Sequence, residues 1–182
     1  DNWEAFSQQL DHHRQRVQGH FDKVFAAPQT ETEAEDRRFE EIWQQHVERS
    51  QAQELLEEAG FENGEQSLQL LNVFRSSHTC RGLGAKGRER LDRLMPLLLA
   101  AIAGSSAPDQ TLDRLIRLLE AIARRTSYLA LLVESPLALS QLVRLTSISP
   151  WISQQIARQP LLLDEMLDPR RLYTPLRRES LE

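Results

Sequence analysis

Apolar residues recur at helical spacing along almost the whole of this 182-residue chain. Between residues 112 and 123, for example, leucine, isoleucine and alanine fall three or four positions apart, which places them on one face of a helix. The alternation of apolar and polar residues that marks a half-buried strand is absent from the sequence. The Asn63-Gly64 pair lies between helical segments rather than between two apolar runs. These patterns predict an all-α fold with more than about 60% helix and no sheet.

Prolines divide the last third of the chain into short segments. Each follows a Ser, Gln or Asp, so each pair has the pattern of an N-cap and a first helical residue; the prolines are Pro136, Pro150, Pro160 and Pro169. The helices predicted between them cover residues 137–145, 151–157 and 161–167. Helices of this length are not stable alone. We therefore expect an irregular multi-helix bundle in which short helices cross at steep angles, on a core formed by Leu115, Ile116, Leu119, Ile122, Leu129, Leu132, Leu139, Leu142, Ile152, Ile156 and Leu162.

The beginning of the chain has a different organisation. Residues 1–27 carry one amphipathic stripe and are expected to form a helix. Residues 28–36 are acidic and lack large apolar side chains, which predicts an exposed linker. A helical domain is expected over residues 37–180, starting with a single surface helix over 37–59 that Gly60 ends. The final two residues, 181–182, resemble the remnant of an expression vector.

Two further features of the helical domain carry expectations. A more hydrophobic helix starts at Gly64, and the next one, closed by Gly104, contains Pro96, which should kink or restart it. Ser106 is expected to cap the helix that follows, with Asp109 as a capping residue in a capping-box-like start.

Composition narrows the class of protein. The longest apolar run, residues 95–103, is far shorter than the roughly 18 residues that a membrane span needs. The polar, acidic start has no signal-peptide pattern. Cys80 is the single cysteine, so no intramolecular disulfide can form and a cytoplasmic, reducing location is expected.

Charge is distributed unevenly along the chain. Residues 1–80 have a net charge of −9 and residues 81–182 a net charge of +4, within a total of −5. Of the 22 basic residues, 20 are arginine, whose planar guanidinium pairs with carboxylates better than lysine does. We expect the two halves to fold against each other or onto other domains. The acidic total argues against a nucleic-acid partner.

A literal G-x-G-x-x-G motif occurs at residues 82–87. In a dinucleotide-binding fold this motif follows a strand, whereas here the preceding segment has helical spacing. We therefore interpret it as a flexible turn between helices. Basic side chains surround it, which indicates contact with an anion or an acidic partner. The hinge or partner-contact loop predicted on this basis comprises Arg75, Arg81, Gly82, Gly84, Lys86, Gly87 and Arg88.

The sequence contains no recognisable catalytic or metal-binding constellation. All five histidines precede residue 80, and neither CxxC nor HExxH is present, so no metal site is predicted. Cys80 has no positioned base and is expected to be a buried structural thiol. The Gly-Ser turn with a paired Asp-x-Asp that nucleotidyl transfer requires is also missing: Gly104-Ser105 is followed by Asp109 and Asp113, four residues apart on a helix. No catalytic residue is assigned.

Residues 125–176 closely resemble the bifunctional glutamine synthetase adenylyltransferase/adenylyl-removing enzymes of proteobacteria. The most specific segments are SPWISQQIARQP, from Ser149, and PLLLDEMLDP, from Pro160. Residues 68–99 and 3–25 are similar to the same family. The resemblance therefore covers nearly the whole chain and is weakest over residues 28–59.

This resemblance implies a place in a larger enzyme. Family members carry two nucleotidyltransferase domains, each with Mg²⁺: one attaches adenylyl groups from ATP to glutamine synthetase, and the other removes them by phosphorolysis. The chain resembles the region between these domains, with residues 1–27 as the tail of the preceding helical domain. Its implied role is non-catalytic and cofactor-free, connecting and coupling the two sites, with the flanking catalytic domains, glutamine synthetase and the PII signal protein as partners. The alternative is a self-standing helical adaptor that binds one protein partner through its Arg-rich loop.

Overall fold

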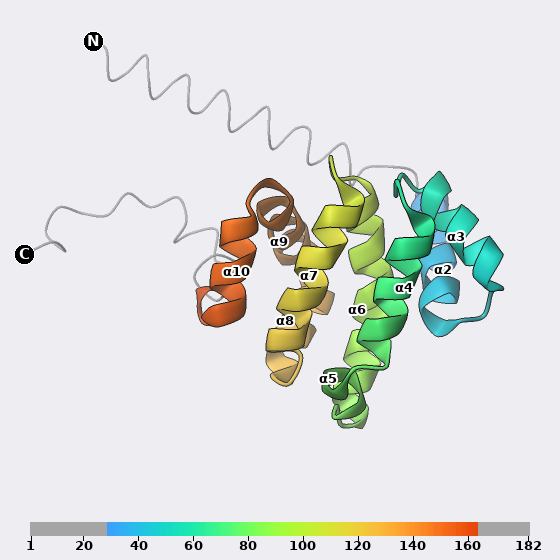
Figure 1. Cartoon of the computed structure of the whole chain (residues 1–182). Coiled ribbons are helices and arrows are strands. Elements are labelled where there is room, and N and C mark those ends of the chain that lie inside the picture. Colours follow the sequence, from blue (N-terminus) through green and yellow to red (C-terminus); the bar gives the residue numbers. More distant parts are fainter. Residues whose placement is uncertain (1–28, 164–182) are drawn as a thin grey trace, which may run out of the picture. The chain divides into compact units, whose positions relative to one another are not determined.

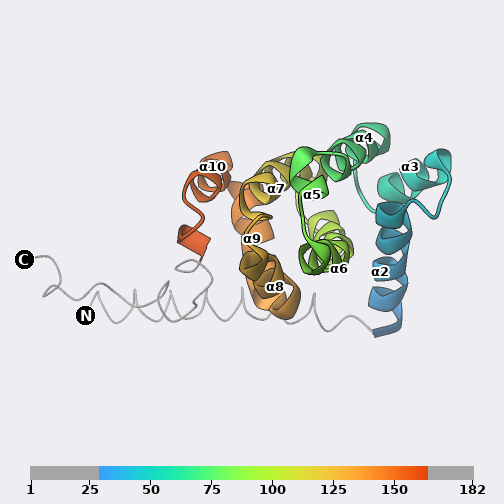
Figure 2. The same ribbon diagram turned by 90° about the horizontal axis from the view of Figure 1, so that it is seen from below.

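The computed structural model describes residues 29–163, which form an all-α structure (Figures 1 and 2). Helices account for 80% of these residues, and none of them forms a strand. This confirms the predicted fold class. The helices are α2 (Gln29–Gln44), α3 (Arg49–Glu58), α4 (Gly64–Arg75), α5 (His78–Arg81), α6 (Ala85–Ala103), α7 (Pro108–Ile122), α8 (Thr126–Glu134), α9 (Pro136–Ile148) and α10 (Pro150–Arg158). The predicted helix over 1–27, the segment around Pro169 and residues 181–182 lie outside the described range.

The chain divides into two compact units, Asp1–Asp36 and Arg37–Glu182. Of the first unit, residues 29–36 are described, and they are helical. The linker expected at this position is therefore wrong for these residues. The reason is that the stretch contains neither glycine nor proline, and its glutamates near the start of the helix are favourable to the helix dipole.

Residues 37–59 form two helices rather than the single helix predicted. Gln45, with φ 58°, takes a left-handed conformation and ends α2. The amide of His46 then donates back to the carbonyl of Glu41, as in a Schellman-type end. Glu48 precedes α3 without a side-chain capping bond. The predicted surface location holds for one face only, because Phe39 and Trp43 are buried.

Two predicted helix boundaries are confirmed and one is corrected. Gly60, with φ 99°, follows α3, and Gly104 follows α6. α6 runs through Pro96 without restarting. Ser106 does not cap α7, since the N-cap residue is Ala107 and has no side-chain capping bond.

The Pro-started helices of the last third are largely confirmed. Ser135 and Ser149 cap α9 and α10, each accepting a hydrogen bond from the amide three residues on, with proline at the first helical position. The axes of α8 and α9 differ by 105°, in agreement with the expected steep crossing. Pro160 differs: it and Leu161 form a turn, and helical geometry resumes at Leu162.

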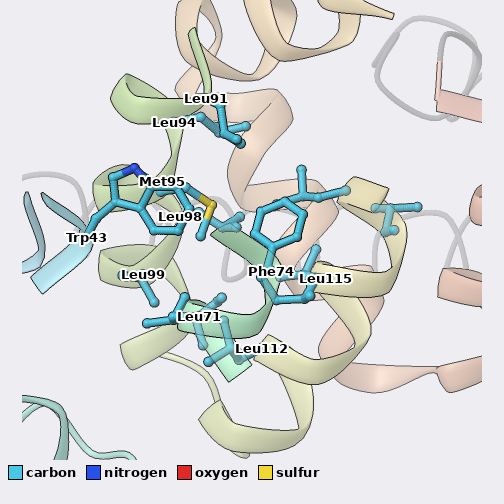
Figure 3. Close-up of a cluster of buried hydrophobic side chains, with 14 of the residues drawn as sticks. Trp43, Leu71, Phe74, Leu91, Leu94, Met95, Leu98, Leu99, Leu112 and Leu115 are labelled. Atoms are coloured by element: carbon cyan, nitrogen blue, oxygen red, sulfur yellow. The ribbon is translucent and has the colours of Figure 1, made fainter. Parts of the chain in front are cut away.

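One continuous hydrophobic core extends from Phe39 to Leu163 (Figure 3). Its centre is α6 and α7, with α4 packed on α7, and α8, α9 and α10 packed around them. Within the predicted core, Ile152 and Leu162 are half-buried and every other residue is buried. The prediction omitted the α6 contribution, which includes Leu91, Leu94, Met95, Leu98, Leu99 and Ile102.

Among residues 29–163, no single helix has the length and apolar character of a membrane span. Only α8 and α9 taken together meet those criteria, with the 105° bend between them. The apolar residues Leu129 and Leu142 of this pair belong to the core.

Candidate partner-contact and hinge region

The three glycines of the G-x-G-x-x-G motif occupy different structural positions. Gly82 ends α5, with φ −83°, and Gly84 precedes α6, with φ −70°. Gly87 lies inside the first turn of α6 and is buried. No strand precedes the motif, and helix α5 does. The prediction of a turn between helices is therefore confirmed, while its conformation at Gly82 and Gly84 is one that other residues also adopt.

The space around each glycine also differs. A Cβ atom on Gly84 would meet nothing within 4 Å. On Gly82 it would approach the carbonyl oxygen of His78 at 3.1 Å, and on Gly87 it would approach Cγ2 of Thr126 at 3.1 Å. Gly87 therefore serves close packing between α6 and the start of α8, and only Gly82 and Gly84 remain as candidate hinge positions.

Arg75 points into the structure rather than toward a partner. Its guanidinium donates to the backbone carbonyl of Trp43 and, at 2.7 Å, to Oδ1 of Asn72. It also lies over the Trp43 ring, 5.5 Å from the centroid. Burial lowers the pKa of Arg75, the charge of Arg88 lowers it further, and Asp92 opposes the shift. Arg75 therefore attaches the end of α2 to α4.

Asp92 on α6 completes this polar cluster. Its carboxylate accepts a hydrogen bond of 2.8 Å from the Trp43 indole and pairs with Arg88 at 3.2 Å. Together, Trp43, Arg75, Arg88 and Asp92 connect α2, α4 and α6. Two of the predicted loop arginines, Arg75 and Arg88, thus have structural contacts, which the sequence pattern of clustered cations could not distinguish from free ones.

The exposed basic side chains of the region come from two turns. Arg81 and Lys86 flank the α5–α6 turn, and Arg124 and Arg125 form the α7–α8 turn. Sequence reasoning missed the second pair, because more than 35 residues separate it from the first. Its one sequence signal is that two adjacent arginines follow a strongly amphipathic helix.

Asp109 has a capping role, although a different one from that predicted. Its carboxylate accepts hydrogen bonds from the amides of Glu62 (2.7 Å) and Asn63 (3.3 Å) and from Oγ of Ser67 (2.8 Å). Asp109 therefore holds the turn before α4 against the start of α7. No acidic pair suited to nucleotidyl transfer is formed with Asp113, which pairs with Arg117.

The described residues contain no group of His, Cys, Asp or Glu side chains that could hold a metal ion. Cys80 is buried, in agreement with the predicted structural thiol. Burial raises the pKa of the Cys80 thiol, outweighing the opposing effects of Ser77 and Arg88. Cys80 is therefore unsuited to act as a nucleophile.

Comparison with curated proteins finds three similar relatives that share one name, "Bifunctional glutamine synthetase adenylyltransferase/adenylyl-removing enzyme". The protein of Thioalkalivibrio sulfidiphilus is 53% identical over 100% of this chain, that of Nitrosococcus oceani 50% over 99%, and that of Pseudomonas putida 42% over 96%. The chain spans about a fifth of the length of these relatives: 19%, 19% and 18%, respectively. No family model matches the chain.

Proposed function

This chain belongs to the family of bifunctional glutamine synthetase adenylyltransferase/adenylyl-removing enzymes, and on that premise we propose that it is the non-catalytic helical segment between two opposed nucleotidyltransferase domains. In this proposal the complete enzyme adenylylates glutamine synthetase with ATP and Mg²⁺ and removes the adenylyl group by phosphorolysis, in the cytoplasm. The chain itself binds neither ATP nor Mg²⁺. It couples the two activities in response to nitrogen signals, among them glutamine and the PII protein.

A coupling element is required because two opposed activities on one protein would otherwise consume ATP in a futile cycle. Suppressing one activity while the other runs takes a coupling free energy of typically about 1–3 kcal/mol between the sites. Such energy is transmitted by packed elements that have two discrete arrangements. The segment between the catalytic domains is the covalent route along which part of it can pass.

The observation that carries the proposal is the single core from Phe39 to Leu163. Within residues 37–163, α3 lies beside α4 at one side and α10 lies beside α7 and α9 at the other (Figures 1 and 2). Closely packed cores do not deform continuously, so a displacement of α2 or α3 must shift neighbouring helices as rigid pieces. A spacer with independent helices would lack this property.

The turn at Gly82–Gly84 is the hinge within this proposal, and the structure offers a matched pair of variants to test it. Gly84→Ala and Gly104→Ala both accept a Cβ without a contact under 3.4 Å, and both glycines have φ near −70°. Alanine denies the left-handed conformations that a glycine hinge can enter. In the complete enzyme, Gly84→Ala should change how glutamine and PII shift the ratio of adenylylation to deadenylylation, whereas Gly104→Ala should not.

The control for both variants is the activity of each catalytic domain without effectors, which should stay unchanged. If Gly84→Ala is regulated as the unmodified enzyme is, the hinge is not at this turn. If variants throughout the Phe39–Leu163 core also leave regulation intact while the protein stays folded, the segment is only a spacer.

The alternative, a self-standing adaptor that binds through its Arg-rich loop, is favoured by the exposure of Arg81 and Lys86. The internal contacts of Arg75 and Arg88 argue against the loop alone as the binding element. Binding of the isolated 182-residue chain to glutamine synthetase or PII, measured by calorimetry, would support this alternative.

A further inference from the structure

We propose that the α5–α6 and α7–α8 turns form one composite docking surface for an acidic protein segment. The surface, called the basic corner below, comprises Arg81, Lys86, Arg124 and Arg125, all of them exposed. It does not depend on the coupling role proposed above, because it concerns what the surface binds rather than what the binding changes.

Contacts on the two turns bring the four cations to the same end of the helical body. Nη2 of Arg124 lies 3.4 Å from Nδ1 of His78, which joins the end of α7 to α5. Nη1 of Arg90 donates at 3.0 Å to the carbonyl of Thr126, which joins α6 to the start of α8. Figure 1 shows α5, the beginning of α6 and the beginning of α8 at the lower end of the view.

The charge of this corner is positive despite the negative total of the chain. The neighbouring arginines Arg88 and Arg90 have partners of their own, Asp92 and the Thr126 carbonyl, so they are directed away from a ligand. The acidic side chains on the same elements are the exposed Glu89 and Glu120, together with the paired Asp92. Four outward cations thus alternate with two outward carboxylates.

This mixed pattern favours a protein segment over other anions. Nucleic acids and anionic membranes present one continuous sign of charge, which the two glutamates and the total charge of −5 would repel. Guanidinium groups pair with carboxylates through two parallel hydrogen bonds, and three of the four cations are arginine. A chain segment rich in glutamate or aspartate, with basic residues opposite Glu89 and Glu120, is the complementary partner.

The test uses the 182-residue protein and a fluorescent hexaglutamate peptide, with affinity measured by anisotropy at 50 and 300 mM NaCl. We expect binding at low salt that weakens by roughly ten-fold at high salt, because exposed charge pairs are screened. Arg124→Glu/Arg125→Glu should lower affinity about ten-fold or more. The matched control is Arg144→Glu/Arg158→Glu, which reverses two exposed arginines on α9 and α10 and should change affinity less than about two-fold.

A second pair, Arg81→Glu/Lys86→Glu, tests whether the surface is composite and should lower affinity by a similar factor. All three double variants should keep the unfolding midpoint, since the side chains are exposed. The proposal is overturned if the peptide does not bind at 50 mM NaCl, if the control pair loses as much affinity as the others, or if only one turn matters. It is also overturned if ATP or phosphate displaces the peptide at equal concentration, or if phosphatidylserine vesicles bind more tightly than the peptide.

Discussion

The helix pair α2–α3 and the helix pair α9–α10 are both short and both packed on the same core, yet different interactions define their ends. Ser135 and Ser149 cap α9 and α10, with proline at the first helical position. The end of α2 depends on Gln45 in a left-handed conformation, whose side chain donates to Asn72. Arg75 also donates to the Trp43 carbonyl from 32 residues away.

The difference teaches that local and distant interactions can define equivalent elements in one domain. Residues within the segment itself set the start of α9 or α10, so each can form early and then dock. The α2–α3 break requires α4 and α6 to be in place, because its hydrogen-bond partners lie there. We therefore expect α2 and α3 to lose their structure first when the domain is destabilised.

The largest effect should come from the helix that both regions share. α7 contacts α4 on one side and α9 and α10 on the other, and Leu119 on α7 is fully buried. Leu119→Ala should lower the free energy of unfolding by about 2–5 kcal/mol, through lost burial and a new cavity. Urea denaturation checks this. Leu137→Ala, at an exposed leucine, is the control and should cost under about 0.5 kcal/mol. A loss below 1 kcal/mol at Leu119 would contradict its buried position.

A smaller loss, confined to one region, should follow removal of Asp109. Asp109→Ala leaves the amides of Glu62 and Asn63 and the Ser67 hydroxyl without their acceptor, and should cost about 1–3 kcal/mol. Hydrogen exchange should accelerate at Glu62 and Asn63 while amides of α9 and α10 keep their protection. Asp113→Ala removes only an exposed pair with Arg117 and is the control. Equal acceleration in α10 would contradict the regional difference.

Local capping in the other region predicts a loss of about 1 kcal/mol. Ser149→Ala removes the acceptor for the Ile152 amide at the start of α10. Ser106→Ala is a sharp control, because the sequence predicts a cap there and the structure shows none. Thermal unfolding should separate the two variants. If Ser106→Ala costs as much as Ser149→Ala, the capping assignments are wrong.

The smallest expected effect is a gain. Gly84→Ala should raise the free energy of unfolding by about 0.4–1 kcal/mol, because its φ of −70° suits alanine and its Cβ meets nothing within 4 Å. Gly64→Ala should destabilise instead, since its Cβ would lie 2.5 Å from the Gln53 carbonyl oxygen where α3 meets α4. Urea denaturation of both variants measures the contrast. A gain at Gly64 would contradict the close approach of these helices.

The sequence predicted the all-α class and the starts of α9 and α10, because each of these rests on signals within a few residues. It did not predict the break at Gln45, since no glycine or asparagine marks that left-handed residue. It placed Leu162 in the core, whereas Leu163 is buried, because the turn at Pro160 shifts the helical phase by one residue.

The candidate site was predictable in part. The cations next to the G-x-G-x-x-G motif are visible in the sequence, and Arg81 and Lys86 are exposed as a contact loop requires. The inward direction of Arg75 depends on Trp43, and the contribution of Arg124 depends on the packing of α7 against α5. Neither relation leaves a pattern in a single sequence, because both join residues more than 30 positions apart.

The contrasting settings of Trp43 and Trp151 give the domain two built-in optical probes. Trp43 is 2% exposed and in contact with Arg75, Phe74 and Asp92, whereas Trp151 is 66% exposed. With Trp3 replaced by phenylalanine, acrylamide should quench the emission of Trp151 and leave that of Trp43. The spectrum of Trp43 then reports the release of α2 from the body while every other helix stays in place.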